Sequence, residues 1–372
     1  MSRKNKRDFD YNPYYDDPQP DPAPAKRKLS KKRKAVNITV AVLSSLSLLV
    51  GGGCMYAEGM ISNINTMSSD DEFQINSGLV SQLEADNQAN AVNSRIEIGD
   101  GATRGLYHDS AVMNILLLGV DDYQANDVGR SDSQMLLTID TRHKKLKVTS
   151  FMRDMYVQIP GYSPNRINVA YSLGGPALTV QTLESNFGVD IDRFVIIDYD
   201  HFEDIVDTLG GVELEITAEE ANLVNRHSGE SSSKRLTGGT RVLTGKQARY
   251  YSRIRAIGND QARTERQRKV VMSLVEKLKK SDLFTINNAL SKILNMITTN
   301  INTNEMLALV SNAMTYLNYP MEQNRIPFEG GYENTFVTIS GQRASVLIPN
   351  LRQNSANLVE FLYEDDVPPR VK

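Results

Sequence analysis

The chain has 372 residues, a formal net charge of −3 and a pI of about 5.9, which allows one or two domains with a sizeable core. A protein that coats nucleic acid would carry a basic excess across a whole domain, so this composition argues against that class. The single cysteine excludes an intrachain disulfide framework and a cysteine-ligated zinc site, and four histidines argue against a histidine-based metal site.

The N-terminal region predicts a single-pass membrane anchor. Residues 1–34 are polar, rich in proline and basic at their end, so they are predicted to form a disordered cytoplasmic tail. Residues 35–57 carry no charge, and a helix rising about 1.5 Å per residue over this span would cross a bilayer core of about 30 Å. Basic residues precede the span and acids follow it, so the positive-inside rule places everything after about Tyr56 outside the membrane.

Two alternatives to the transmembrane helix stay open. The small residues 51–53 are compatible with a cleaved signal peptide, and Cys54 is compatible with lipoprotein processing. The charged prefix is long for a signal peptide, and Gly51 stands where a lipoprotein signal has a leucine-like residue. The transmembrane helix is therefore preferred. Residues 58–110, rich in Asn, Ser, Asp and Gln, are predicted to form a stalk with one short amphipathic stretch.

The region after the stalk predicts an α/β domain over residues 111–363. Apolar runs predict strands and amphipathic runs predict helices, and the two types alternate. This order predicts a three-layer-like α/β/α sandwich around a mixed central sheet. The tail from 364 to 372 is predicted to be loose. The strands are expected at 114–121, 135–140, 146–152, 194–198 and 212–216, and the helices at 169–187, 201–209, 286–297, 303–316 and 350–362.

An arginine-dense stretch runs from Arg249 to Lys269. Thr244 and Gln247 fit a capping box that begins a helix, and a second helix is predicted from near Asp260 to about Lys280. The apolar stripe of the second helix continues backwards onto Gln267 and Arg263, so its inward face becomes polar at the N-terminal end, where anions are favoured. Arg253 and Arg255 would diverge on a regular helix, so an irregular segment is expected there. The other basic residues, Arg249, Arg266, Arg268 and Lys269, are predicted to be solvated.

Charged residues also stand at the ends of the predicted strands, where the sites of α/β folds gather. They are Asp121 and Asp122 after the first strand, Arg130 and Asp132 before the second, and Arg153 and Asp154 after the third. Arginines fork onto phosphate oxygens, and carboxylates hold Mg²⁺ or Mn²⁺. Together with the arginine stretch, these residues predict a site for a pyrophosphate and a divalent cation.

The order and spacing of these blocks resemble the LytR-CpsA-Psr family. The matching blocks lie within the motif core 111–280, and they are 115–121, 129–133, 150–154, 166–171, 174–175, 209–212, 243–245 and 263–268. The chain departs from the family pattern at Phe151 and Met152, where Ile-Pro is usual, at Ser133, where Thr is frequent, and at Ala262, where Gly is frequent.

The resemblance implies an enzyme that moves a glycopolymer from a polyprenyl-pyrophosphate carrier to peptidoglycan, commonly at a muramic acid 6-hydroxyl. It implies that Asp121 and Asp132 serve the metal, Mg²⁺ or Mn²⁺, and catalysis. The implied pyrophosphate contacts are Arg130, Arg153, Arg253, Arg255, Arg263 and Gln267, of which Arg153, Arg253 and Arg255 also serve catalysis. Asp154 and Asp260 match acids of the family motifs.

Two other functions stay open at this point. A lipid-pyrophosphate phosphatase would differ from a transferase only in that water attacks instead of a sugar hydroxyl. A membrane-anchored regulator would bind wall polymer without turnover. The polymer itself, whether teichoic acid, capsule or another glycan, is not specified by the sequence. A polyprenyl tail requires an apolar tunnel, which we expect between the sheet and the helices from residues 169 to 209 and beyond 270.

Overall fold

The computed structural model describes residues 64–67, 77–120 and 129–371. The predicted cytoplasmic tail, the transmembrane span 35–57, Asp121 and Asp122 lie outside these ranges. Within them, no helix is both long enough and apolar enough to cross a membrane.

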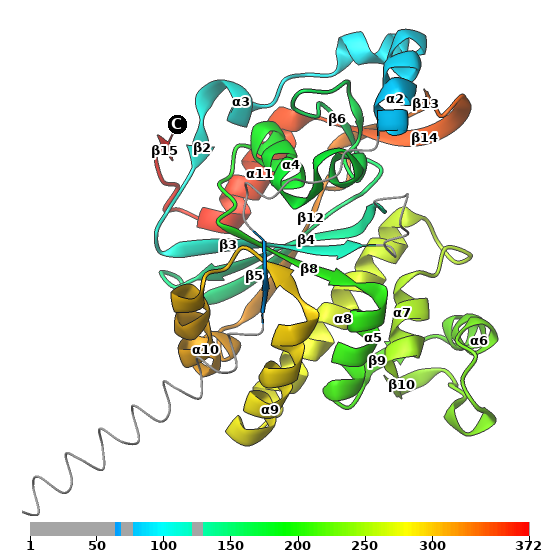
Figure 1. The fold of residues 1–372 in the computed structure, drawn as a ribbon, viewed down its shortest axis with the longest axis vertical. Coiled ribbons are helices and arrows are strands. Elements are labelled where there is room, and N and C mark those ends of the chain that lie inside the picture. Colours follow the sequence, from blue (N-terminus) through cyan, green and yellow to red (C-terminus); the bar gives the residue numbers. More distant parts are fainter. Residues whose placement is uncertain (1–63, 68–76, 121–128, 372) are drawn as a thin grey trace, which may run out of the picture. The chain divides into compact units, whose positions relative to one another are not determined.

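A seven-stranded mixed sheet forms the centre of the fold (Figure 1). β3 pairs with β8 in parallel and with β4 antiparallel, β4 pairs with β5 antiparallel, and β12 joins β5 in parallel. The predicted α/β class with a mixed sheet is therefore confirmed. The strand order is β1 (Asn65–Thr66), β11 (Thr298–Thr299), β8 (Arg193–Asp198), β3 (Val112–Val120), β4 (Ser131–Asp140), β5 (Lys145–Phe151) and β12 (Met321–Ile326).

Helices cover both faces of the sheet because its central strands are apolar on both sides. Leu116 and Leu118 of β3 belong to the core beneath α4 (Val169–Phe187) and α11 (Leu351–Tyr363). Ile115 packs on the opposite face, with side chains of α8 (Asp260–Lys280) and α10 (Thr303–Leu317). Figure 1 shows α4 and α11 on one side of the sheet, and α8, α9 (Leu283–Ile293) and α10 on the other.

A smaller unit packs beside α8. It contains α5 (Tyr199–Thr208), the hairpin of β9 (Val212–Ile216) and β10 (Gly239–Leu243), α6 (Ala218–His227) and α7 (Gly245–Ser252). Its core joins Val212, Val224 and Tyr251 to Val270 of α8. In Figure 1, α7 lies between α6 and the pair α5 and α8. The α7 helix therefore has α5 and α8 on the side that faces the sheet, and α6 on the opposite side, which we call its outer side.

Shorter elements complete the described chain. The helices are α2 (Ser77–Ala89) and α3 (Asp100–Arg104), with 3₁₀ turns at Ala91–Arg95, Ser232–Lys234 and Leu294–Met296. The strands form three pairs, β15 (Arg370–Val371) with β2 (Leu106–Tyr107), β6 (Tyr156–Val157) with β7 (Asn165–Arg166), and β13 (Tyr332–Ile339) with β14 (Gln342–Pro349).

The described part of the predicted stalk is not a free spacer. Leu83 of α2 is buried against Ile159 and Leu173, because the amphipathic stretch buries its apolar face in this cluster. The Asn90 side chain accepts from the backbone N–H of Thr338 at 2.7 Å and donates to its carbonyl at 2.9 Å. Residues 77–110 therefore belong to the folded unit, which corrects the prediction for this segment.

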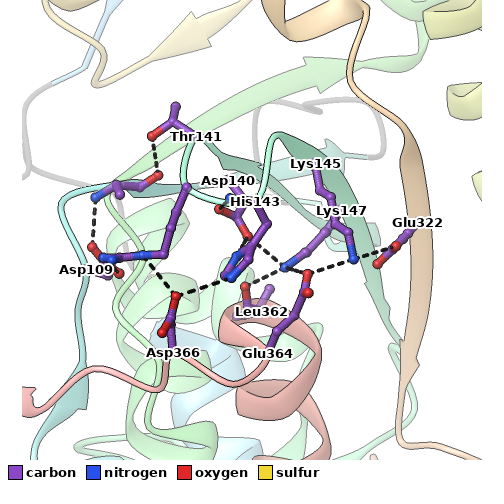
Figure 2. Close-up of polar contacts among 12 residues, drawn as sticks. Asp109, Asp140, Thr141, His143, Lys145, Lys147, Glu322, Leu362, Glu364 and Asp366 are labelled. Carbon is purple, nitrogen blue, oxygen red and sulfur yellow. Dashed lines mark hydrogen bonds and ion pairs between the residues drawn. The ribbon is translucent and has the colours of Figure 1, made fainter.

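The C-terminal tail is also held, contrary to the loose tail predicted for 364–372. β15 pairs with β2, and Arg370 donates to the carbonyl of Gly105 at 3.0 Å. Figure 2 shows the network at the end of α11, in which buried Lys147 donates to Asp140 and to the carbonyl of Leu362 at 2.9 and 2.8 Å. Glu364 lies 2.9 Å from the same ammonium group. A buried ammonium needs such partners, and they fix the start of the tail.

Candidate active site

Four strand ends meet at one edge of the sheet. The register pairs Val120 at the end of β3 with Ser131 at the start of β4 and with Asp198 at the end of β8. β5 ends beside the start of β4, since Gln134 pairs with Phe151. Residues that flank these positions are therefore brought together, as predicted for Asp132, Arg153 and Asp154. The network of Figure 2 lies at the opposite ends of β4 and β5.

Asp132 is the acidic centre of this edge among the described residues. Its Oδ1 lies 2.6 Å from Nη1 of Arg153, and its Oδ2 lies 3.5 Å from the Tyr199 hydroxyl and 3.9 Å from Nη2 of Arg255. Burial raises the pKa of Asp132, but the guanidinium groups of Arg153, Arg263 and Arg255 outweigh it and hold the pKa below its ordinary value. Asp132 is therefore ionised at neutral pH.

The N-terminus of α8 brings a second acid to the same edge. Asn259 caps this helix by accepting from the N–H of Ala262 at 3.1 Å, and Asp260 occupies its first turn. Asp260 Oδ1 lies 2.8 Å from Nη2 of Arg263 and 3.6 Å from Nε of Arg153. Burial raises the pKa of Asp260, and Arg263 opposes that shift. Asp260 Oδ2 is buried and has no hydrogen-bond partner among the described residues.

Arg263 differs from the other predicted phosphate contacts. Its side chain is only 3% exposed, and burial lowers its pKa even though Asp260 acts in the opposite direction. Its guanidinium therefore faces Asp260 within the protein. Arg153 also contacts a third acid, since its Nε lies 3.8 Å from Asp154, which pairs with Arg166 at 3.3 Å.

Arg253 and Arg255 lie on an irregular segment, as predicted. α7 begins after the capping box of Thr244 and Gln247 and ends at Ser252, so both arginines follow it. The Arg253 guanidinium lies over the Tyr199 ring, 4.5 Å from its centroid. Arg255 is 60% exposed and reaches toward Asp132. Both guanidinium groups are thus presented at the surface of the site.

Buried Arg266 holds this irregular segment in place, which corrects its predicted surface position. Its Nη1 donates to the carbonyl of Ile254 at 3.2 Å, its Nη2 to the carbonyl of Ile257 at 3.0 Å, and its Nε to Glu220 at 2.7 Å. One planar guanidinium thereby fixes the backbone on both sides of Arg255. The spacing contained a signal for this role, because Arg266 stands four residues before buried Val270 on one helix face.

The other residues of the arginine stretch have mixed surroundings. Arg249 pairs with Glu203 at 2.7 Å and is 19% exposed, so it bridges α7 and α5 rather than lying in open solvent. Burial lowers the pKa of Arg268, which bonds Gln323. Lys269 pairs with Glu265 on the surface, as predicted.

An apolar cavity of about 110 Å³ opens beside the arginines. It lies between the sheet and the helices α5 and α8, and Arg253 and Gln267 stand among its lining residues. The apolar part of the lining comprises Leu117, Leu118, Met135, Ile197, Phe202, Val270 and Val271. This position agrees with the tunnel predicted between the sheet and the helices, although α4, on the other face of the sheet, contributes nothing to it.

The remaining predicted site residues are Arg130 and the metal ligands. Arg130 is exposed and makes no ion pair with the described residues. Two groups of possible metal ligands occur in the part of the chain that the structure describes, at His108, Asp190 and Asp192 and at Asp140, His143 and Glu364, and neither includes Asp132. Asp132 nevertheless fits a hard cation, because it is ionised and both contacts of its Oδ2 are 3.5 Å or longer.

Comparison with known proteins identifies the family. The sequence model of the LytR_cpsA_psr family matches residues 74–352. The chain belongs to this family. The resemblance inferred from the motif blocks is therefore confirmed, and the LytR_cpsA_psr match extends from α2 to the start of α11.

Individual LytR_cpsA_psr relatives give the range of similarity. The chain is 33% identical over 205 residues to polyisoprenyl-teichoic acid–peptidoglycan teichoic acid transferase TagV of Bacillus subtilis strain 168, covering 53% of this chain and 51% of that protein. The chain thus spans about half the length of this relative. It is 30% identical over 260 residues to regulatory protein MsrR of Staphylococcus aureus strain COL, covering 68% of this chain and 75% of MsrR. The crystal structure of B. subtilis TagV matches with a TM-score of 0.55 and 26% identity, covering 68% and 98% of the two chains.

Proposed function

We propose that this protein transfers a glycopolymer from a polyprenyl-pyrophosphate carrier to peptidoglycan, forming a phosphodiester with a muramic acid 6-hydroxyl. The observation that carries the proposal is the apolar cavity lined by Arg253 and Gln267. A prenyl tail favours an apolar environment, and a pyrophosphate favours guanidinium groups. At about 110 Å³ the cavity would take the part of the tail next to the pyrophosphate. The name of the TagV relative supports the same reaction class.

The guanidinium groups of the site suit a reaction in which negative charge grows on the leaving phosphate. The acceptor oxygen attacks the sugar-proximal phosphorus, an O–P bond forms, and the bond from that phosphorus to the bridging oxygen breaks. The electron pair leaves with polyprenyl phosphate, and the hydroxyl proton passes to a carboxylate or to water. Arg153, Arg253 and Arg255 would stabilise the growing negative charge, and one such arginine is worth roughly 10³ to 10⁵ in rate in phosphoryl transfer.

The remaining predicted residues have distinct duties in this proposal. Arg130 and Gln267 would complete the pyrophosphate contacts. Arg263 would act from within the protein by holding Asp260. Asp132, whose pKa is lowered, would orient the acceptor rather than serve as a strong base.

A divalent cation is part of the proposal. Asp132 and Asp121 would hold Mg²⁺ or Mn²⁺, which when bound would neutralise charge on the pyrophosphate. Residues 35–57 would anchor the chain in the cell membrane with its catalytic domain outside, where the lipid carrier and the peptidoglycan acceptor meet.

The test is incubation of the purified protein with a lipid-linked glycan and peptidoglycan oligomers, with mass spectrometry of the products. The wild type should form a phosphodiester-linked product. Arg253→Ala should abolish that product while circular dichroism remains native, since Arg253 is exposed at the end of α7. Arg226→Ala, an exposed arginine of α6, is the matched control and should retain transfer. Full transfer by Arg253→Ala would overturn the assignment.

The name of the MsrR relative motivates a second candidate, a regulator that binds wall polymer without turnover. The same incubation distinguishes the two. A regulator would leave the lipid-linked glycan intact, whereas a phosphatase would release glycan phosphate without joining it to the acceptor.

A further inference from the structure

A second cavity lies on the outer side of α7. It has a volume of about 410 Å³, within the range of about 300–1,000 Å³ that small-molecule sites occupy. Leu223 and His227 of α6, Tyr250 of α7 and the segment 254–256 line it, and it shares Arg253 with the apolar cavity. In Figure 1, α7 lies between α6 and α5. The pocket and the apolar cavity share one lining residue, Arg253, which directly follows α7.

The lining suits a sugar ring. The rings of His227 and Tyr250 are stacked, with centroids 6.4 Å apart and planes 22° apart, and the Arg249 guanidinium lies 5.2 Å from the Tyr250 centroid. His227 and Arg249 both contact Tyr250, and the rings of His227 and Tyr250 form the aromatic part of the pocket lining. A pyranose has an apolar face of C–H groups that packs on aromatic and aliphatic side chains, and a rim of hydroxyls that needs donors. Ile254 provides apolar surface, and exposed Arg255 provides donors at the rim.

The reaction geometry indicates which sugar enters. In phosphoryl transfer the attacking and leaving oxygens stand roughly in line on opposite sides of phosphorus. With the tail of the leaving group in the apolar cavity, the nucleophile arrives from the other side of Arg253. The pocket of Leu223, His227 and Tyr250 adjoins Arg253 and is lined by α6, α7 and the segment after α7 rather than by the sheet. We propose that this pocket binds a sugar ring of the peptidoglycan acceptor and delivers its hydroxyl to the site. The inference rests on the proposed transferase function.

The test measures transfer rate against the concentration of peptidoglycan oligomers at saturating lipid-linked glycan, and then against the concentration of lipid-linked glycan at saturating oligomers. Tyr250→Leu retains apolar bulk but removes the aromatic face, so the KM for the acceptor should rise roughly two- to tenfold, the range set by one aromatic contact. His227→Ala, at an exposed position, should act in the same direction and serves if Tyr250→Leu fails to fold. Tyr250→Phe should stay near wild type, because the ring is kept.

The matched control is Tyr316→Leu, since Tyr316 also pairs with a neighbouring aromatic ring, at 5.9 Å, but lies on α10. The KM of Tyr316→Leu for the peptidoglycan acceptor should equal that of the wild type. Binding of geranyl pyrophosphate, measured by calorimetry, should be unchanged in every variant.

Three outcomes separate the possibilities. A wild type that forms no linked product refutes the proposed function itself. A wild type that transfers, with unchanged acceptor KM in both Tyr250→Leu and His227→Ala, refutes only the acceptor pocket. A rise confined to the KM of the lipid-linked glycan would assign the pocket to the donor sugar and would also overturn the inference.

Discussion

Arg266 provides a quantitative test of how the site is assembled. Its side chain is about 6% exposed and joins Glu220 to two backbone carbonyls of the segment that carries Arg255. Arg266→Ala would leave Glu220 without its counter-charge, and breaking a buried ion pair in this way costs about 3–5 kcal/mol. The freed carbonyls add to the cost wherever water cannot reach them. We therefore expect a loss of about 3–5 kcal/mol in the free energy of unfolding.

Urea unfolding followed by circular dichroism would measure this loss, and transfer kinetics would measure its effect on the site. Lys269→Ala is the matched control, because Lys269 pairs with Glu265 on the same helix with both side chains 51% exposed. An exposed pair of this kind contributes about 0–1 kcal/mol. Under native conditions the transfer rate of Arg266→Ala should be lower than that of the wild type, because the backbone on both sides of Arg255 loses its bonds to the Arg266 guanidinium. Equal stability of the two variants would refute the buried role of Arg266.

Two further predictions concern pH and metal. Burial raises the pKa of Glu184 to about 7, so the folded state binds a proton more tightly than the unfolded state, and stability should fall as pH rises from about 4.5 to 7. Glu184→Gln should remove about 1–2 kcal/mol of this pH-dependent loss of folding stability, after allowance for solvent screening. The variant should therefore have a higher Tm than the wild type at pH 8 but not at pH 4.5. Equal Tm differences at both pH values would contradict the burial argument. Chelation by EDTA should abolish transfer, and added Mg²⁺ or Mn²⁺ should restore it, whereas an unchanged rate in metal-free buffer would remove the cation from the proposal.

Local sequence signals predicted the elements whose causes are local. The capping box of Thr244 and Gln247 placed α7, and the apolar stripe ending at Leu278 placed α8. The apolar run of β3 and the acids and arginines beside its neighbours indicated the edge of the sheet where the site forms. Such signals involve residues within one or two turns of a helix or within one strand, so they can be recognised without knowledge of the fold.

Features that depend on distant partners were not predictable in the same way. The β12 strand reads as polar from Met321 to Ile326, and only its pairing with β5 makes it part of the sheet. The spacing of Arg266 to Val270 indicated an inward position, but its bonds to Glu220 and to the carbonyl of Ile254 depend on segments that are distant in the sequence. The helix α6 was missed although Thr217 and Glu220 form a capping box, a local signal that was available.

The central claim is that the acceptor hydroxyl, rather than water, attacks the lipid-linked pyrophosphate. The most direct measurement counts polyprenyl phosphate released against glycan joined to peptidoglycan in one reaction, using ¹⁸O-labelled water and mass spectrometry. The account predicts equal amounts of the two products and no ¹⁸O in the new phosphodiester. Release of polyprenyl phosphate with ¹⁸O in free glycan phosphate, and no linked product, would contradict it.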